Sequence, residues 1–233
     1  MEIELGKLRE KIDSIDKEIL ELILKRMECV EKVGELKGKN NFRIYVPERE
    51  NSIFRNLHEK GEEIGGKGKI SQREIENIFT EIISFCRSKE RKVKVYTEDY
   101  SCFFIARKIF GSCIDMGLPG EGKSLEDCDF KIVKLSEERY GEIFLEKIFK
   151  FIVSVIDFSG ERYIILGKDS NGRGKESYTG ALIFHLKEKK YEFRELKGFM
   201  EDGEIQREIK NLSISPDIEI KILGSYEKRE IEG

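Results

Sequence analysis

The chain has 233 residues, of which 38% are charged and 39% hydrophobic, with a formal net charge of −3. The balance of 43 basic against 46 acidic side chains argues against a nucleic-acid-binding protein, which needs a cationic surface to neutralise phosphates. No stretch approaches the roughly 18 apolar residues of a membrane span. The acidic start MEIELGKLREKID is unlike a signal peptide, so a cytoplasmic protein of one large or two small domains is expected.

The cysteine and histidine pattern argues against a metal centre and against a disulfide framework. The cysteines are odd in number and never fall in a CxxC spacing, and neither His58 nor His185 has a second ligand at metal-binding spacing. Reduced thiols and no metal are therefore expected. The five cysteines are Cys29, Cys86, Cys102, Cys113 and Cys128.

The N-terminal segment predicts one long helix. From Leu5 to about Lys37, apolar residues recur at three- and four-residue steps, and the segment contains no proline. A helix of this length spans about 50 Å. A globule of about ninety residues cannot cover it alone, so a homodimer is expected to bury its apolar face.

Two shorter helices are predicted to follow. Pro47 suits the first turn of a helix that ends near Gly61, and the glycine-rich segment 62–69 is expected to be a loop. Ser71 and Glu74 then have the spacing of a capping box and predict the start of a third helix. The first ninety residues therefore form three helices and no strands.

Cations on the long helix predict an anion site. Arg26 and Lys37 lie three helical turns apart, so they point within about 20° of each other with their Cα atoms about 16 Å apart. Val30 and Val33 lie between them and would form an apolar floor under a small dianion. Arg9 lies about a quarter turn off this face and would reach the partner's pocket in an antiparallel dimer. Taken singly, such cations are usually solvated or paired, and that alternative stays open.

Three further charged residues have a functional and a simpler interpretation. Arg49 and Glu50 could be site residues, or they could simply lie on the surface of the second helix. Glu90 continues the inward face of Ile83 and Cys86, so it would end a buried stripe unless the helix end frays.

The segments LREKIDSIDKEILELILKRMECVEKVGELK, VPERE and IENIFTEIISFCRSKE resemble the all-helical chorismate mutases. In particular they resemble the mutase domain that begins bifunctional chorismate mutase–prephenate dehydratases. The resemblance covers Leu8–Glu90. It implies an intertwined homodimer that converts chorismate to prephenate without a cofactor or metal.

The resemblance also implies roles for individual residues. Arg9 would enter the pocket from the other chain, and Arg26 would be the second carboxylate clamp. Lys37 would bind a carboxylate and the ether oxygen. Arg49 would support the pocket, and Glu50 would accept the ring hydroxyl of the substrate.

At three positions the sequence departs from, or varies within, the family pattern. Val46 replaces an aspartate that contributes mainly its backbone N–H, and Cys86 replaces a serine, which should weaken one carboxylate contact. Glu90 stands where the family has a glutamine or, in some members, a glutamate against the ether oxygen. A carboxyl can donate to that oxygen only when protonated, so activity is expected to fall as Glu90 ionises.

Short β-type runs alternate with helical stretches after residue 91, which predicts an α/β region. The Gly-rich segment 167–175 lacks the spacing of a P-loop, so phosphate binding is not expected there. The expected strands are Lys92–Tyr96, Phe130–Leu135, Tyr163–Leu166, Ala181–Leu186, Tyr191–Leu196 and Ile218–Leu223, and the expected helices are Phe103–Phe110, Tyr140–Phe151 and Gly203–Leu212.

Parts of this region resemble the dehydratase and ACT domains of bifunctional relatives. VYTEDYSCFFIARKIFG is similar to the opening strand and helix of the dehydratase, and YTGALIF and IKILGSYEKRE are similar to ACT strands. Glu137 and Glu138 replace the dehydratase Asn-Ser pair, and Glu161 replaces its catalytic threonine. The connection from Phe158 to Gly160 leaves no room for a second dehydratase subdomain. Dehydratase activity is therefore expected to be absent. The ACT helix and strand that would carry the inhibitor-binding residues are missing from the resemblance, which puts phenylalanine feedback through the usual site in doubt.

The chain is interpreted as multidomain: an all-α, three-helix chorismate mutase domain at 1–91, a truncated dehydratase-like region at 92–168 and a degenerate ACT-like region at 169–233. Its expected function is chorismate mutase in phenylalanine and tyrosine biosynthesis. The α/β region is expected to stabilise the dimer or to dock another enzyme of the aromatic pathway. Two alternatives stay open, namely a full bifunctional enzyme and a non-catalytic regulatory or scaffold dimer.

Overall fold

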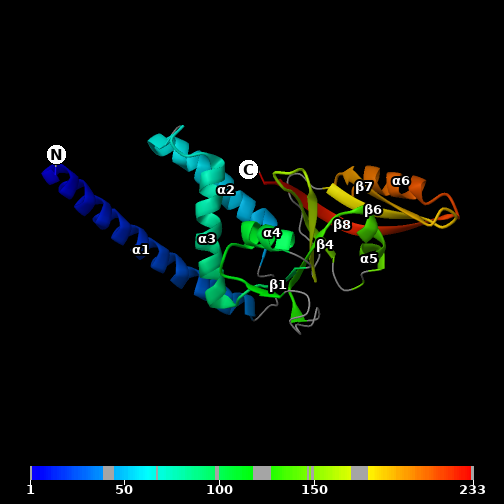
Figure 1. The fold of residues 1–233 in the computed structure, drawn as a ribbon, viewed down its shortest axis with the longest axis horizontal. Helices are drawn as coiled ribbons and strands as arrows, with labels where there is room; N and C mark the ends of the chain where they lie inside the picture. The colour runs from blue at the N-terminus through cyan, green and yellow to red at the C-terminus, as the bar shows by residue number, and fades with distance from the viewer. Residues whose placement is uncertain are drawn as a thin grey trace.

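The computed structural model combines a helical N-terminal part with an α/β part (Figure 1). It describes residues 2–38, 45–66, 68–97, 100–117, 127–145, 147, 150–168 and 178–231. The Gly-rich segment 167–175 lies largely outside the described residues.

The three predicted helices are confirmed as α1 (Glu2–Gly38), α2 (Pro47–Gly61) and α3 (Gln72–Glu90). The capping box is also confirmed, because Ser71 Oγ accepts the backbone N–H of Glu74 at 3.2 Å and the Glu74 carboxylate accepts the backbone N–H of Ser71 at 2.7 Å. These two bonds satisfy donors that the helix itself cannot pair.

A loop was expected over residues 62–69, and this prediction was wrong for residues 62–66. Glu62–Gly66 forms a short π-helical turn, η1, that continues α2. Gly65, at φ +90°, ends it in a left-handed conformation that glycine adopts without steric cost. The glycines therefore end the helix later than expected.

The α/β part is one sheet of eight strands, in the order β2-β1-β3-β5-β4-β8-β6-β7. Its strands are β1 (Lys94–Thr97), β2 (Asp115–Gly117), β3 (Phe130–Lys134), β4 (Lys150–Ile156), β5 (Arg162–Gly167), β6 (Tyr178–His185), β7 (Lys190–Lys197) and β8 (Ile218–Glu230). Its helical segments are α4 (Tyr100–Phe110), the 3-10 turn η3 (Glu137–Arg139), α5 (Tyr140–Leu145) and α6 (Gly203–Leu212).

The predicted helix Tyr140–Phe151 was wrong beyond Leu145. The segment Lys150–Ile156 is strand β4, which pairs antiparallel with β5 and parallel with β8. Its sequence KFIVSVI is rich in β-branched residues, which pack well between two neighbouring strands. The short strand β2 was also missed by the sequence prediction.

Strand β8 joins the two halves of the sheet. Its first part pairs antiparallel with β6, and its last part, Glu227–Glu230, pairs parallel with β4. The predicted boundary at 168/169 therefore crosses a continuous sheet, and the division into two regions there stays a prediction.

The central strand β5 is buried on both faces. Tyr163 and Ile165 pack in the cluster that α4 covers, whereas Ile164 and Leu166 pack in the cluster that α5 covers. A strand that is buried on both faces has a continuous run of apolar residues in its sequence and not an alternating pattern. The run YIIL has this pattern, so it could be predicted as a strand.

The helical part is packed against the α/β part at several points. Tyr45, which precedes α2, is 2% exposed and lies edge-on to Phe110 (ring centroids 4.7 Å apart) and Phe130 (5.7 Å). Arg91, at the end of α3, makes a bidentate ion pair with Asp129 at 2.8 and 2.9 Å. The two parts therefore share a core and are not joined by a free linker.

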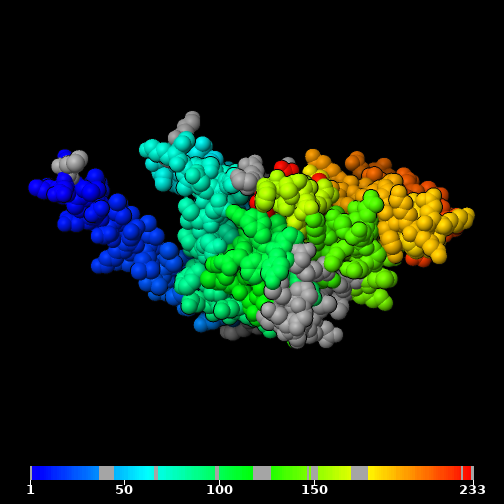
Figure 2. All heavy atoms as spheres, in the orientation of Figure 1, coloured from blue at the N-terminus to red at the C-terminus, as the bar shows by residue number. Residues whose placement is uncertain are grey.

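Helix α1 extends well past the rest of the chain (Figures 1 and 2). At 37 residues it is about 55 Å long. Six apolar residues of its N-terminal part lie on one face and are 45–62% exposed. These residues, called the α1 stripe below, are Leu5, Leu8, Ile12, Ile15, Ile19 and Leu22.

Replacing Gly111 with Ala tests the packing of α4 on α3. Gly111 has φ +75°, and a Cβ there would lie 2.4 Å from Ser84 Cβ. We expect a loss of about 2–4 kcal/mol in the free energy of unfolding, from left-handed strain plus overpacking. Gly160→Ala is the control, since Gly160 has φ +82° with no atom within 4 Å of the added Cβ, and should lose only about 1 kcal/mol. Equal losses in urea titrations would show that the contact with Ser84 does not hold the two parts together.

Candidate functional site

Glu50, in the first turn of α2, is buried beside an arginine. It is 6% exposed, and its Oε1 accepts a hydrogen bond from Nη1 of Arg87 on α3 at 2.6 Å. Among the described residues its carboxylate accepts no other hydrogen bond. The alternative in which Glu50 belongs simply to the surface of α2 is therefore excluded, and Glu50 is an oriented, largely desolvated acceptor.

Opposing effects act on the Glu50 carboxyl. Burial raises its pKa above the ordinary value of 4.5, and the positive charges of Arg87, Arg229 and Arg26 oppose that rise. Arg26 comes from α1, Arg87 from α3 and Arg229 from β8. Both the helical part and the last strand of the sheet therefore contribute charge to this position.

Arg26 supplies a buried donor that no described residue satisfies. Its side chain is half-buried, and its Nη1 is a buried atom without a hydrogen-bond partner among the described residues. Leaving such a donor unpaired costs free energy. A guanidinium group in this state, close enough to influence Glu50, is suited to receive an anionic ligand.

Glu90 lies on the last turn of α3 against the end of α1. It is half-buried, and a Cβ placed on Gly34 would lie 2.8 Å from Glu90 Cγ. Gly34 thus provides the space that Glu90 occupies. The expected place of Glu90 at the end of a buried stripe is confirmed, because Ile83 and Cys86 on the same face are buried as well.

The remaining predicted residues have different surroundings. Cys86 has 0% exposure, so its thiol has no opening to solvent in the single chain. Val46 is the N-cap of α2, and its carbonyl accepts the N–H groups of Arg49 and Glu50 at 3.0 and 3.2 Å. Arg49 is exposed.

Arg9 and Lys37 are not brought to Glu50 by the described chain. Arg9 is exposed on the projecting half of α1. Lys37 lies in the last turn of α1, and its side chain falls outside the described residues. In one chain the charge of Arg26 on α1 acts on Glu50 of α2, and Glu90 of α3 lies against Gly34 of α1, whereas Arg9 stays apart.

A pocket of about 610 Å³ opens elsewhere, between α2, α3, the end of α4 and β8. Its walls include Arg55, Arg73, Lys108 and Arg229, with Phe54 beneath. None of the predicted site residues whose side chains are described lines it.

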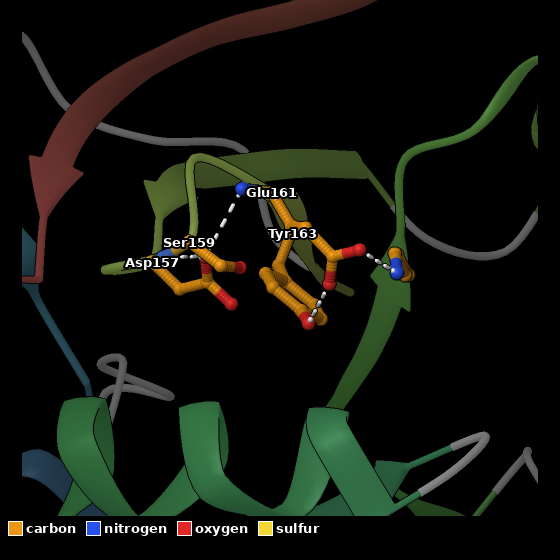
Figure 3. Close-up of polar contacts among 5 residues, drawn as sticks. Asp157, Ser159, Glu161 and Tyr163 are labelled. Atoms are coloured by element: carbon orange, nitrogen blue, oxygen red, sulfur yellow. Dashed lines mark hydrogen bonds and ion pairs between the residues drawn. The ribbon is translucent and has the colours of Figure 1, made fainter.

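A second polar cluster holds the turn between β4 and β5 (Figure 3). Asp157 Oδ1 accepts from Ser159 N at 2.9 Å and from Glu161 N at 3.0 Å. Glu161 also pairs with Lys134 and accepts the Tyr163 hydroxyl at 3.1 Å. Burial is the main cause that raises the pKa of Tyr163, to about 12. These contacts close a hairpin, and the β4–β5 connection therefore holds no further subdomain.

The described residues form no group of three or more side chains suited to hold a metal ion. All five cysteines are free thiols. No described helix is long and apolar enough to cross a membrane.

Arg87 and Tyr45 were missed by the sequence interpretation. Tyr45 lies 5.6 Å from Arg87, measured from its ring centroid to the guanidinium carbon. A signal for Arg87 was present, since it follows Ile83 by four residues and falls on the inward face of α3. A lone arginine on an apolar helix face indicates a buried ion pair.

Comparison with known proteins places the helical part in a family. Residues 8–91 match the family model of chorismate mutase type II. The bifunctional chorismate mutase/prephenate dehydratase of Aquifex aeolicus is 45% identical over 92 residues, which make up 40% of this chain and 25% of that protein. The T-protein of Enterobacter agglomerans is 46% identical over 65 residues, 28% of this chain and 17% of that protein. The chain therefore spans a quarter or less of the length of these relatives.

Among solved structures, the prephenate dehydratase from Streptococcus mutans covers 60% of this chain and 100% of its own, at 13% identity and a TM-score of 0.42. The family match over residues 8–91 confirms the resemblance to chorismate mutases inferred for Leu8–Glu90.

Glu50→Gln tests the electrostatic state of the buried carboxyl. Because burial raises the pKa of Glu50 above 4.5, the folded protein retains a proton there that the unfolded chain has released. The stability that wild type gains from Glu50, relative to the Gln variant, should therefore fall as pH rises from 4.5 through the raised value. Urea unfolding of both proteins up to pH of about 7 measures this difference. If the stability of wild type relative to the variant instead rose over this range, the charges of the arginines would lower the pKa of Glu50 more than burial raises it.

Proposed function

We propose that the protein is a chorismate mutase, which converts chorismate to prephenate in phenylalanine and tyrosine biosynthesis. The observation that carries this proposal is the buried, unsatisfied Nη1 of Arg26 beside the oriented carboxylate of Glu50. A cation with an unsatisfied donor, whose charge acts on the Glu50 acceptor, suits a ligand that bears a carboxylate and a hydroxyl. The type II match over residues 8–91 supports the same function.

The reaction explains why these residue types are needed. The rearrangement is concerted and intramolecular, so no nucleophile, proton transfer or cofactor is required. The protein has to hold the reactive conformer and stabilise the negative charge that grows on the breaking ether oxygen. In the proposed site Arg26 clamps a carboxylate, Glu50 accepts the ring hydroxyl, and Lys37 and Glu90 donate to the ether oxygen. Arg49 supports the pocket, the backbone N–H of Val46 contributes to it, and Cys86 is the weakest contact.

The proposed active form is a homodimer in which α1 packs on its counterpart. The α1 stripe is a continuous apolar face that the chain does not cover, and its length suits a second copy of the same helix. Antiparallel packing would bring Arg9 of one chain to the pocket of the other. Arg9 of the second chain would then add a cation to the pocket that contains Arg26 and Glu50 of the first chain.

We further propose that the α/β region has no dehydratase activity. Glu161, at the position of the family's catalytic threonine, is held by Lys134 and Tyr163 in the hairpin. Stabilisation of the dimer and docking of another aromatic-pathway enzyme stay the expected roles of the region. A cytoplasmic location stays a prediction.

The direct test incubates purified protein with chorismate, follows the loss of chorismate absorbance and assays prephenate and phenylpyruvate. Prephenate that accumulates without phenylpyruvate is the expected result. Phenylpyruvate would favour the bifunctional alternative, in which the α/β region retains a dehydratase site. An absence of turnover, with the fold verified by circular dichroism, would favour the non-catalytic scaffold.

Mixed dimers of Arg9→Ala and Arg26→Ala chains test the shared pocket. Each variant alone should lose at least about a hundredfold in kcat/KM, because each lacks one carboxylate clamp. A heterodimer isolated through two different tags contains one pocket with both arginines and one with neither. It should therefore recover about half of wild-type activity. If both arginines served the same chain's pocket, no heterodimer would recover activity.

Glu90→Leu tests whether position 90 donates to the ether oxygen. Leucine cannot donate, so kcat/KM should fall at least about tenfold, whereas Glu90→Gln carries an amide donor and should keep or exceed the wild-type value. Steady-state kinetics of the three proteins measure this. A leucine variant as active as wild type would exclude a donor at position 90.

A further inference from the structure

Arg87 is a buried cation with no role in the site proposed above. It is 6% exposed and stands on the inward face of α3, among buried neighbours that include Ile83, Ser84 and Cys86. Burying a guanidinium is costly unless its donors are paired. Its partners therefore indicate what it does.

The guanidinium group connects two elements that lie far apart in the sequence. Nη1 donates to Glu50 Oε1 at 2.6 Å, and Nη2 donates to the backbone carbonyl of Phe110 at 2.7 Å. Phe110 is the last residue of α4, where the helix dipole favours a cation. Since the guanidinium is planar and rigid, fixing one edge on α4 fixes the direction in which the other edge holds Glu50.

A third contact limits movement of this group. The ring of Tyr45 lies 5.6 Å from the guanidinium carbon, and Tyr45 is itself packed against Phe110 and Phe130 of the α/β part. The orientation of Glu50 is therefore set from the α/β side of the molecule as well as from α2.

We propose that Arg87 is a positioning residue for the mutase reaction, which fixes one oxygen of Glu50 to the carboxyl end of α4 and leaves the other for the substrate's ring hydroxyl. This inference rests on the proposed function and deepens it. It gives the α/β region a part in catalysis, because the last turn of α4 sets the geometry of an acceptor in the helical domain. Arg229 on β8 also acts on Glu50 through its charge, so a second element of the α/β region influences this carboxyl.

A double-mutant cycle with Glu50→Gln and Arg87→Lys tests the proposal in the full-length protein. Lysine keeps the charge but is a single-point donor, which cannot hold Glu50 and the α4 carbonyl in one plane. Arg87→Lys alone should lower kcat/KM for chorismate about tenfold, mainly through KM, because a hydroxyl contact acts in both ground and transition states. In the Glu50→Gln background the same change should alter kcat/KM less than about twofold.

Arg91→Lys is the matched control. Arg91 is also a bidentate arginine near the end of α3, but it pairs with Asp129 and makes no described contact with Glu50. Its substitution should leave kcat/KM within about twofold of wild type. If Arg87→Lys does not fold, as judged by circular dichroism, Arg87→Gln takes its place, since it removes the buried charge and keeps a donor.

The outcomes separate this inference from the proposed function. Active wild type, with an Arg87 effect that disappears in the Glu50→Gln background, supports the positioning role. Active wild type with two independent, multiplying effects overturns it and leaves the mutase function intact. Wild type without chorismate turnover overturns the proposed function and the positioning role with it.

Discussion

The length of α1 is the constraint on which the proposed active form depends. A helix of 37 residues carries an apolar face well beyond the part that α3 covers. Its exposed leucines and isoleucines would gain several kcal/mol on leaving water, by the usual value of about 25 cal/mol per Å² of buried apolar surface. A second copy of the same helix is the partner whose length and pattern match this face. In the proposed dimer, packing of α1 on its counterpart stabilises the helix and also places Arg9 in the pocket of the other chain. The same contact therefore accounts for the stability of the dimer and for the assembly of the site.

The junction between the helical and α/β parts is the second organising feature. Tyr45 packs with aromatic rings of the α/β core, Arg91 pairs with Asp129, and Arg87 pairs with Glu50 while bonding to the end of α4. Strand β8 pairs with β4 and carries Arg229, whose charge acts on Glu50. The α/β part is therefore not an independent appendage, because its elements contact the residues on which the proposed mutase site is built.

Much of the helical part could be predicted from the sequence because its signals are local. The periodicity of α1, Pro47 and the capping box at Ser71 each act within a few residues. Strand β4 was missed because KFIVSVI is a short apolar run that periodicity alone does not assign to helix or strand, and its two partner strands decide the question. The sequence did indicate that the connection from Phe158 to Gly160 is too short for another subdomain, but not that it closes a hairpin.

The candidate site was predictable only in part. The resemblance named Arg26, Glu50 and Glu90. In the structure the charge of Arg26 acts on Glu50, and Glu90 packs against Gly34 of α1. The inward position of Arg87 had a local signal, but its pairing with Glu50 could not be read from the sequence, because it joins residues 37 positions apart and depends on Phe110, 23 positions beyond Arg87. The contribution of Arg9 depends on a second chain and stays a proposal, and the side chain of Lys37 falls outside the described residues.

Sedimentation velocity on the full-length protein, with mutase activity measured at the same concentrations, tests most directly whether two chains build the pocket. The chain has a mass of 27.2 kDa, and the active species should sediment with twice that mass. Specific activity should fall when dilution dissociates the dimer. A monomer of 27.2 kDa that turns over chorismate at full specific activity would contradict the account.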